Sequence, residues 1–166
     1  MICPVCQWQN FLGDDVCENC GADLSRSDTP EEPTSYHGRL LGMHLDKLGA
    51  ARPVTVDGEL SAAEAIARMK RDGLDCLLVT EGGRLVGIFT DRDAILKVGA
   101  LADDKRPLRE VMTTDPVVLR REDPIAVAIH KMAIGGFRHV PIVDGGLPIG
   151  LVSARDVFRH LAAGLA

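Results

Sequence analysis

The sequence predicts an α/β protein made of one unit used twice, preceded by a small metal-binding segment. GIFTDRDAI at residues 87–95 reappears as GLVSARDVF at residues 150–158, an offset of 63 residues without a gap. Two Cys-x2-Cys pairs lie within the first 20 residues. A repeat of this length is one compact unit, and two such units normally bury together the apolar surface that neither can bury alone.

The duplication extends beyond this motif. Identical residues recur at the same offset: Pro53/Pro116, Glu59/Glu122, Ala63/Ala126, Ile66/Ile129, Met69/Met132, Gly73/Gly136 and Gly82-Gly83/Gly145-Gly146. Since these positions and the motif together run from residue 53 to residue 95, about two thirds of the period, the match is an internal duplication and not a short motif found twice.

Each copy is predicted to run strand, helix, strand, strand, helix, giving a mixed α/β fold of two β-α-β-β-α repeats. In the first copy these elements are a strand at 53–56, a helix capped by Ser61, strands at 76–79 and 85–90 around a hairpin turn at 81–84, and a helix from Asp91. In the second copy they are 116–119, 124–136, 139–144, 148–153 and 154–165. A helix is also expected within 39–50, and a loop at 103–107 with a turn at 108–115 connects the copies.

Composition and charge limit the class of protein. The chain has 166 residues, of which 46% are hydrophobic and only 4% aromatic, so an aliphatic core is expected. The net charge is -5 and no segment forms a basic patch. The apolar runs are short, and no basic-then-apolar leader follows Met1. We therefore expect a soluble cytoplasmic protein without a membrane span.

Residues 1–24 are predicted to bind a metal through Cys3, Cys6, Cys17 and Cys20. Each pair can form a tight knuckle, and two knuckles complete a tetrahedral zinc site of four thiolates. A segment this short cannot hold a hydrophobic core, so metal binding would supply its folding energy. Two disulfides, or a redox-active Cys-x2-Cys, are the alternatives. The segment resembles the short zinc ribbons of form CP-x-C…C-x-x-CG, whose motif indicates a metal but not a function.

The charge of the segment bears on its partner. Zinc with four thiolates carries about -2, and four nearby acidic side chains add to it, so nucleic-acid binding is the weaker option. Trp8 and Phe11 are better interpreted as a lid over the metal or as a surface that docks a protein. Residues 25–38 are polar, contain two prolines and show no periodicity, which predicts a linker.

The repeated motif has two interpretations. Thr90 with Asp93, and Ser153 with Asp156, have the S/T-x-x-D spacing of a helix capping box. In the first interpretation the hydroxyl only caps the helix, and the acid is favoured at its positive end. In the second, the same acid is free to bind a ligand at the start of the helix.

Residues 39–166 resemble a tandem pair of cystathionine β-synthase (CBS) domains, a Bateman module, with one repeat at about 40–100 and the other at about 108–164. The resemblance rests on the duplication, on the S/T-x-R-D motif in both copies, and on the phrases REVMTTDPVVL and FRHVPIVDGGLPIGLVS. It implies a regulatory module that is not an enzyme. It also implies that adenine nucleotides such as AMP, ADP or ATP, or related adenosyl ligands, bind between the repeats, and that two modules pair into a homodimer.

The resemblance also implies site residues. Asp93 and Asp156 match the ribose-binding acid, which can accept hydrogen bonds from both ribose hydroxyls, and Thr90 and Ser153 match the preceding hydroxyl. The hydroxyl and the helix N-terminus favour a nearby phosphate. Arg92 and Arg155 either reach phosphates or are solvated helix residues.

The two clefts implied by the resemblance are unequal. The Asp93 cleft would face a group that offers a cation and an imidazole to phosphate: Phe137, Arg138, His139 and Pro141. The Asp156 cleft would face Leu74, Asp75 and Cys76, where an acid stands in the basic position. We therefore predict that the Asp93 cleft is the main nucleotide site, and that the other is weak, empty or suited to an uncharged adenosyl group.

The predicted function is a sensor that binds an adenosine-containing ligand and presents a zinc ribbon to a partner. The sequence shows no P-loop, no Ser/His/Asp grouping and no paired carboxylates with a reason to be perturbed, so catalysis is not expected. The main alternative is a dimeric adaptor with degenerate clefts whose ribbon docks a protein.

Overall fold

The structure, a computed structural model, divides into two compact units, Met1–Gly42 and Met43–Ala166. It describes residues 3, 5–6, 8–10, 16–22, 24, 43–48, 51–99 and 103–163. The predicted linker at 25–38 lies outside the described residues. Among the helices of the described part, none is long and apolar enough to cross a membrane.

The first repeat contains a mixed sheet of four strands in the order β1-β2-β3-β4. Strand β2 pairs parallel to β1 and antiparallel to β3, and β3 pairs antiparallel to β4. The elements are β1 (Thr55–Asp57), α2 (Ala62–Asp72), β2 (Cys76–Glu81), β3 (Arg84–Thr90), α3 (Asp91–Asp93), the π-helical turn η2 (Ala94–Val98) and, from the connection, α4 (Leu108–Val111) and β4 (Thr113–Thr114).

The second repeat contains an antiparallel pair of strands and two helices. Its elements are α5 (Ile125–Gly135), β5 (His139–Asp144), β6 (Leu147–Ser153) and α6 (Ala154–Ala163). The strand predicted at 116–119 is wrong: only Leu119 forms a bridge, parallel to Ile142. This bridge is the counterpart of the Val56–Val79 pair in the first repeat. The residues before it leave the sheet, and Val117 lines a cavity instead.

Local sequence signals explain the elements that were predicted correctly. Ser61 caps α2 in a capping box, in which its hydroxyl accepts from the Glu64 amide and its own amide donates to the Glu64 carboxylate, both at 3.3 Å. The hairpin turn between β2 and β3 places Gly82 and Gly83 at φ values of 54° and 81°. Two successive positive φ angles are typical of a tight hairpin turn and favour glycine.

The segment that precedes each repeat in the chain packs on the other repeat. The bridge between Pro107 and Ser61 brings α4 onto the first repeat, and the bridge between His44 and Pro124 brings the 3-10 helix η1 (Leu45–Leu48) onto the second. The two bridges are related by the repeat offset. The helix expected within 39–50 is described only in this short part. Each repeat therefore needs the other repeat's leading segment to complete its core.

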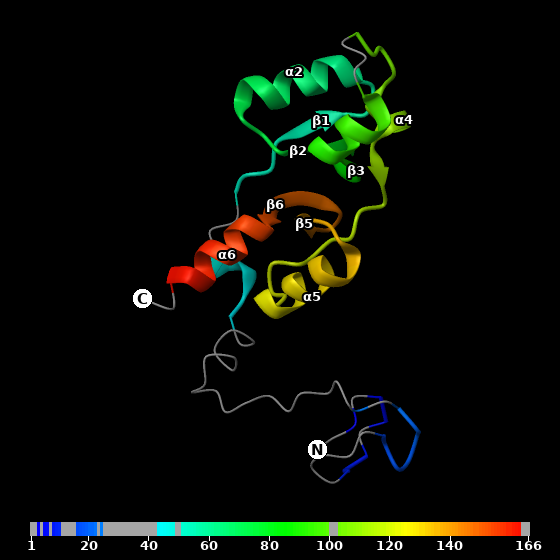
Figure 1. Cartoon of the computed structure of the whole chain (residues 1–166), viewed down its shortest axis with the longest axis vertical. Coiled ribbons are helices and arrows are strands. Elements are labelled where there is room, and N and C mark those ends of the chain that lie inside the picture. Colours follow the sequence, from blue (N-terminus) through cyan, green and yellow to red (C-terminus); the bar gives the residue numbers. More distant parts are fainter. Residues whose placement is uncertain are drawn as a thin grey trace. The chain divides into compact units, whose positions relative to one another are not determined.

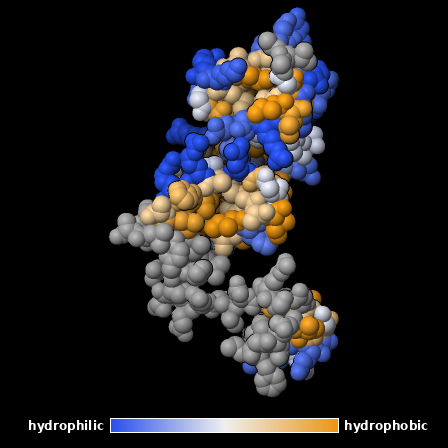
Figure 2. Space-filling view, viewed as in Figure 1, coloured by the Kyte–Doolittle hydropathy of each residue, from blue (hydrophilic) through white to orange (hydrophobic). Residues whose placement is uncertain are grey.

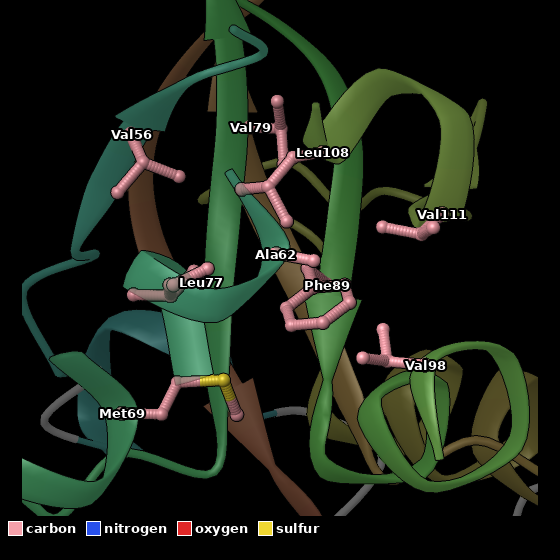
Figure 3. Packing of buried hydrophobic residues seen from close by; sticks show 10 residues of the cluster. Val56, Ala62, Met69, Leu77, Val79, Phe89, Val98, Leu108 and Val111 are labelled. Atoms are coloured by element: carbon pink, nitrogen blue, oxygen red, sulfur yellow. The ribbon is translucent and has the colours of Figure 1, made fainter. Parts of the chain in front are cut away.

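The core of unit 2 has two centres. Figure 3 shows Phe89 of β3 near Ala62, Val98 and Val111 in the first repeat. The second centre is an equivalent cluster: Leu45, Leu119, Ile125, Ala128, Met132, Val140, Ile142, Val152 and Val157. Because both clusters are aliphatic apart from one phenylalanine, the expected aliphatic core is confirmed.

The sheets lie inside and the helices outside. Within unit 2, Figure 1 shows α2 on the outer side of the first sheet and α5 on the outer side of β5 and β6. Leu78, Ile88 and Leu151 pack between the sheets, and Cys76 is buried with them as a small core residue. On the face drawn in Figure 2, hydrophilic residues gather in a band between two hydrophobic groups of this unit.

Candidate functional site

A cavity of about 460 Å³ lies between the two repeats. Its walls come from the end of β3 with α3 and η2, from the segment around β4, and from the turn between α5 and β5. The lining residues are Ile88, Thr90, Asp91, Arg92, Asp93, Leu96, Lys97, Thr113, Asp115, Pro116, Val117, Gly135, Gly136, Phe137, Arg138 and His139. Six of the residues named from the sequence therefore line one cavity: Thr90, Arg92, Asp93, Phe137, Arg138 and His139.

Asp93 is the acid at the wall of this cavity and is only 7% exposed. Its Oδ2 accepts from the Thr90 amide at 3.0 Å and the Thr90 hydroxyl at 2.7 Å. Its Oδ1 accepts from the Thr113 hydroxyl at 2.9 Å and pairs with Lys97 Nζ at 2.7 Å. A carboxylate has about four acceptor sites, so these four contacts use its capacity fully.

The same contacts set the protonation of Asp93. Burial raises the pKa of this carboxyl, but the bonds with Lys97, Thr90 and Thr113 outweigh burial and hold the pKa below its ordinary value. Asp93 is therefore charged at neutral pH. Thr90 and Asp93 form the reciprocal capping box that the spacing of the motif predicts.

Lys97 and Thr113 were not predicted as site residues. Lys97 Nζ also donates to the Met112 carbonyl at 2.9 Å, which fixes it beside β4. The i,i+4 spacing of Asp93 and Lys97 was a signal that could have identified the lysine. No local signal identifies Thr113, because β4 reaches Asp93 through a long-range pairing with β3.

Two ion pairs join the repeats beside the cavity. Arg138 Nη2 lies 3.1 Å from Asp91 Oδ2, and Arg155 Nη2 lies 3.7 Å from Asp75 Oδ2. A polar cavity of about 180 Å³ lies among these charges, lined by Asp75, Asp91, Arg138, His139, Ser153, Ala154 and Arg155. The predicted residues Ser153 and Arg155 thus face this smaller space.

His139 belongs to both cavities. Burial lowers its pKa, Asp75 and Asp91 act in the opposite direction, and Arg138 lowers it further, so that the pKa lies below its ordinary value. The imidazole is therefore neutral at neutral pH, and Arg138 is the cation that this edge of the cavity offers.

Asp156, at the equivalent position of the second repeat, has different surroundings. Its Oδ2 accepts from the Ser153 amide at 3.0 Å and hydroxyl at 2.6 Å, as in a capping box. Among the described residues, its Oδ1 has only a distant contact, 3.5 Å from Arg159, and its side chain is 22% exposed. Asp156 lines neither of the cavities described above.

The other residues expected at the second cleft are largely buried or paired. Burial, followed by the charges of Asp75 and Asp91, raises the pKa of the Cys76 thiol to about 12. Asp75 is engaged by Arg155. Pro141, which was expected at the Asp93 cleft, is instead buried in β5, paired with Leu151, and is not among the residues lining the large cavity.

The four N-terminal cysteines form one cluster in unit 1. All four sulfurs lie within 4.8 Å of one another, with Cys3 and Cys20 3.7 Å apart and Cys6 and Cys17 3.6 Å apart. A tetrahedral zinc with bonds of about 2.3 Å separates its sulfurs by about 3.8 Å, whereas a disulfide needs about 2 Å. The donor set therefore fits a zinc ion.

Electrostatics in the cluster agree with this fit. Burial raises the pKa of Cys17, but backbone hydrogen bonds from Cys20 and Asn19 outweigh it and lower the pKa to about 6. A backbone hydrogen bond from Ala22 lowers the pKa of Cys20, but the neighbouring thiols and burial raise it to about 12. Four adjacent thiols cannot all ionise unless a cation offsets their charge.

Asn10 was not predicted, yet it connects the two knuckles. It is 5% exposed, its amide donates to the Trp8 carbonyl at 3.1 Å, and its side-chain oxygen accepts from the Glu18 amide at 3.0 Å. Trp8 is half exposed and lies outside the buried cluster of cysteines and Leu24. Phe11 lies outside the described residues.

Comparisons with known proteins agree with this geometry. The CBS domain family model matches residues 48–99 and 108–163. A CBS domain-containing protein of Arabidopsis thaliana, CBSCBSPB5, is 37% identical over 111 residues, which are 65% of this chain and 20% of that protein. The Bacillus subtilis protein YhcV is 34% identical over 104 residues, 62% of this chain and 74% of YhcV.

The chain spans about a fifth of the length of the Arabidopsis relative, so the match covers one module of a longer protein. The same holds for L-aspartate semialdehyde sulfurtransferase of Methanocaldococcus jannaschii, which is 32% identical over 109 residues, 64% of this chain and 21% of that enzyme.

Solved structures share the fold. The CBS domain pair of protein MJ0100, in complex with 5′-methylthioadenosine and S-adenosyl-L-methionine, has a TM-score of 0.66 and 25% identity, covering 74% of this chain and 98% of that chain. A CBS domain protein of Pyrobaculum aerophilum complexed with AMP has a TM-score of 0.64 and 23% identity, covering 73% and 99%. The second likeness shows the fold alone.

Proposed function

The chain belongs to the CBS domain family, and on that premise we propose that it is a regulatory module that binds one adenosine-containing ligand in the 460 Å³ cavity. The observation that carries the proposal is Asp93, a buried and charged acid on the wall of that cavity at the first turn of a helix. The complex of the MJ0100 domain pair with two adenosyl compounds supports this class of ligand.

The binding mode follows from the contacts of Asp93. Its four acceptor sites are filled by Thr90, Thr113 and Lys97, so a ribose must replace some of these donors. Lys97 is the donor that yields, because its side chain is 39% exposed and its ammonium group can turn to solvent, whereas Thr90 caps the helix. A ribose hydroxyl then donates to Asp93 Oδ1 at the site that Lys97 leaves, and an adenine lies beside Val117 and Phe137.

The proposed role is regulatory and not catalytic. The sulfurtransferase shares only a fifth of its length with this chain, so its activity is not carried over by the match. Ligand binding between the repeats instead acts on the contacts that join them, since both inter-repeat ion pairs lie beside the cavity. Coupling to a partner requires the bound and free states to differ in their affinity for that partner.

We propose that the N-terminal cysteines bind one structural zinc and that this segment serves as a protein-docking element. The test is the mass of the intact protein under native and denaturing conditions. Bound zinc adds about 65 Da in the native spectrum only, and Cys17→Ser loses it because one of four ligands is gone. A denatured mass about 4 Da below that expected for free thiols would indicate two disulfides and contradict the zinc site.

We also propose a homodimer formed through unit 2. Ile95 and Phe158 occupy the same position in the two repeats and are each 70% exposed, with Leu96 also at 70%. Large apolar side chains exposed at matching positions mark a face that a second copy with two-fold symmetry can cover. Light scattering of Ile95→Glu with Phe158→Glu should report a monomer where the parent chain is a dimer.

The experiment that tests the ligand proposal is isothermal titration with adenosine, 5′-methylthioadenosine, S-adenosylmethionine, AMP, ADP and ATP. We expect at least one of them to bind the parent chain, and Asp93→Asn to weaken that binding. If none binds at millimolar concentration, both acids act as helix caps only, and the module is an adaptor whose partner docks on the ribbon.

A further inference from the structure

The ion pair between Asp91 and Arg138 lies where three spaces meet. Arg138 Nη2 contacts both carboxylate oxygens of Asp91, at 3.1 and 3.4 Å. Both residues line the 460 Å³ cavity, the 180 Å³ polar cavity, and a third hollow of about 440 Å³ that continues past Arg92, Ile95 and Leu96. A ligand group leaving the main cavity on this side must pass the ion pair.

Arg138 and Arg92 are the cations that a ligand phosphate would meet on this route, because both line the main cavity and the third hollow, and Arg138 is the one paired with an acid of the site. Lys97 is engaged by Asp93, and Arg155 is engaged by Asp75 in the polar cavity. Arg138 already has an anionic partner in Asp91, and Asp115 adds a second acid to the cavity wall. The charge available to an incoming phosphate is thus reduced by acids built into the site.

Exchange of partners at Arg138 is feasible because the pair is exposed. The side chains of Arg138 and Asp91 are 67% and 44% exposed, and ion pairs of this kind contribute about 0–1 kcal/mol. A phosphate can therefore take the place of Asp91. The carboxylate of Asp91 remains at the mouth afterwards and repels each further phosphate of the ligand.

The second repeat has no such residue, since the position equivalent to Asp91 is Ala154. The acid is therefore not required by the helix start as such. It is a property of the cleft at Asp93.

We propose that Asp91 is a specificity-determining residue, which occupies Arg138 as an internal anion and makes the cavity prefer adenosyl ligands with no phosphate or one phosphate over di- and triphosphates. The proposal rests on the proposed function, because it concerns the ligand of the same cavity. It goes further by ranking the ligands and by assigning the ranking to one side chain.

The test is a set of titrations of the full chain with 5′-methylthioadenosine, AMP, ADP and ATP, for the parent chain and Asp91→Asn. We expect the variant to bind AMP about 3-fold more tightly and ATP about 10-fold more tightly, while 5′-methylthioadenosine changes by less than about 2-fold. The gain should shrink at high salt, because exposed charges are screened.

The matched control is Asp75→Asn, which removes the other inter-repeat ion pair and leaves the partner of Arg138 in place. We expect it to change the ratio of ATP to AMP affinity by less than about 2-fold. A thermal melt of each variant verifies folding; both acids are more than one-third exposed, so neither substitution should prevent it.

The outcomes separate the two proposals. If Asp91→Asn tightens all four ligands equally, or none of them, Asp91 does not determine specificity, while the adenosyl site itself stands. If neither the parent chain nor the variant binds any of the four, both proposals are overturned. Binding of nucleotides by Asp91→Asn alone would support the role of Asp91 as a built-in competitor.

Discussion

Asp93 and Asp156 occupy the same position in two repeats of one duplicated unit, yet their surroundings differ. Both form a capping box with the hydroxyl three residues earlier. Asp93 is also held by Lys97 and Thr113 at the wall of a large cavity, whereas the further contact of Asp156 within the described part of the chain is with the exposed Arg159. The motif builds the helix start in both repeats, and contacts from outside the motif distinguish the proposed ligand site at Asp93 from the equivalent position at Asp156.

The largest expected effect of a substitution concerns the leading segments that the two repeats exchange. Leu108 and Leu45 are related by the repeat offset, and both are fully buried. Leu45 precedes the first repeat but lies in the core of the second, and Leu108 precedes the second repeat but lies in the core of the first. We expect Leu108→Ala and Leu45→Ala each to lower the free energy of unfolding by about 2–5 kcal/mol, because each leaves a cavity.

Urea denaturation measures this effect, and Ile134→Ala is the control, since that side chain is 74% exposed. If Leu108→Ala were destabilising and Leu45→Ala behaved like the control, the claim that both repeats depend equally on the exchanged segments would be contradicted.

The two acids provide the next largest test. We expect Asp93→Asn to weaken the adenosyl ligand by about 10–100-fold, because a hydrogen bond to a charged acceptor contributes about 1.5–3 kcal/mol. The matched substitution Asp156→Asn should change the affinity by less than about 2-fold. Calorimetric titration of both variants measures the contrast, and equal losses would show that the two clefts are equivalent.

Lys97 provides a smaller test, with His160 as the residue at the equivalent position. We expect Lys97→Met to lower the free energy of unfolding by about 1 kcal/mol, because the part-buried Asp93 loses one of its donors. His160 contacts the Met43 sulfur at 3.3 Å and, within the described ranges, no carboxylate, so His160→Met should cost less.

The effect of Lys97 should depend on pH. The lowered pKa of Asp93 contributes stability above the ordinary aspartate pKa of about 3.9, and this contribution is lost as the pH falls through the pKa of the folded state. Lys97→Met should therefore unfold at a higher pH on acid titration than the parent chain. Unchanged acid unfolding would contradict the assigned role.

The smallest expected effect concerns His139, whose counterpart in the first repeat is the buried Cys76. His139 is surrounded by Asp75, Asp91, Arg138 and Asp156, and burial keeps its pKa below the ordinary value. The unfolded chain therefore binds more protons below about pH 6.5, and stability falls as the pH drops from there through the folded pKa.

Thermal melts at pH 7.5 and 5.5 measure this, and His139→Gln should reduce the difference between the two melting temperatures. A difference as large as that of the parent chain would assign the pH dependence to other groups.

Most of the fold could be predicted because its signals are local. The capping box at Ser61, the double glycine at Gly82 and the motif at Thr90 each fix a turn or a helix start through neighbouring residues. The absence of the strand expected at 116–119 and the pairing of β4 with β3 could not be predicted in this way. Both depend on which sheet the connecting segment joins.

The candidate site shows the same division. The motif pointed to Asp93, and the resemblance to CBS domains implied that Arg138 and His139 face it; all three residues line one cavity. Thr113 reaches Asp93 only through long-range pairing, and the ion pair of Asp91 with Arg138 depends on how the two repeats face each other. Interactions of this kind are not encoded in the spacing along one repeat.

The number of ligands bound per chain tests the central claim most directly. Native mass spectrometry of the parent chain at saturating 5′-methylthioadenosine and, separately, AMP should show one ligand per chain for at least one of the two, absent in Asp93→Asn and retained in Asp156→Asn. Two ligands per chain of equal affinity, with one removed by each substitution, would contradict the claim that the repeats differ in function.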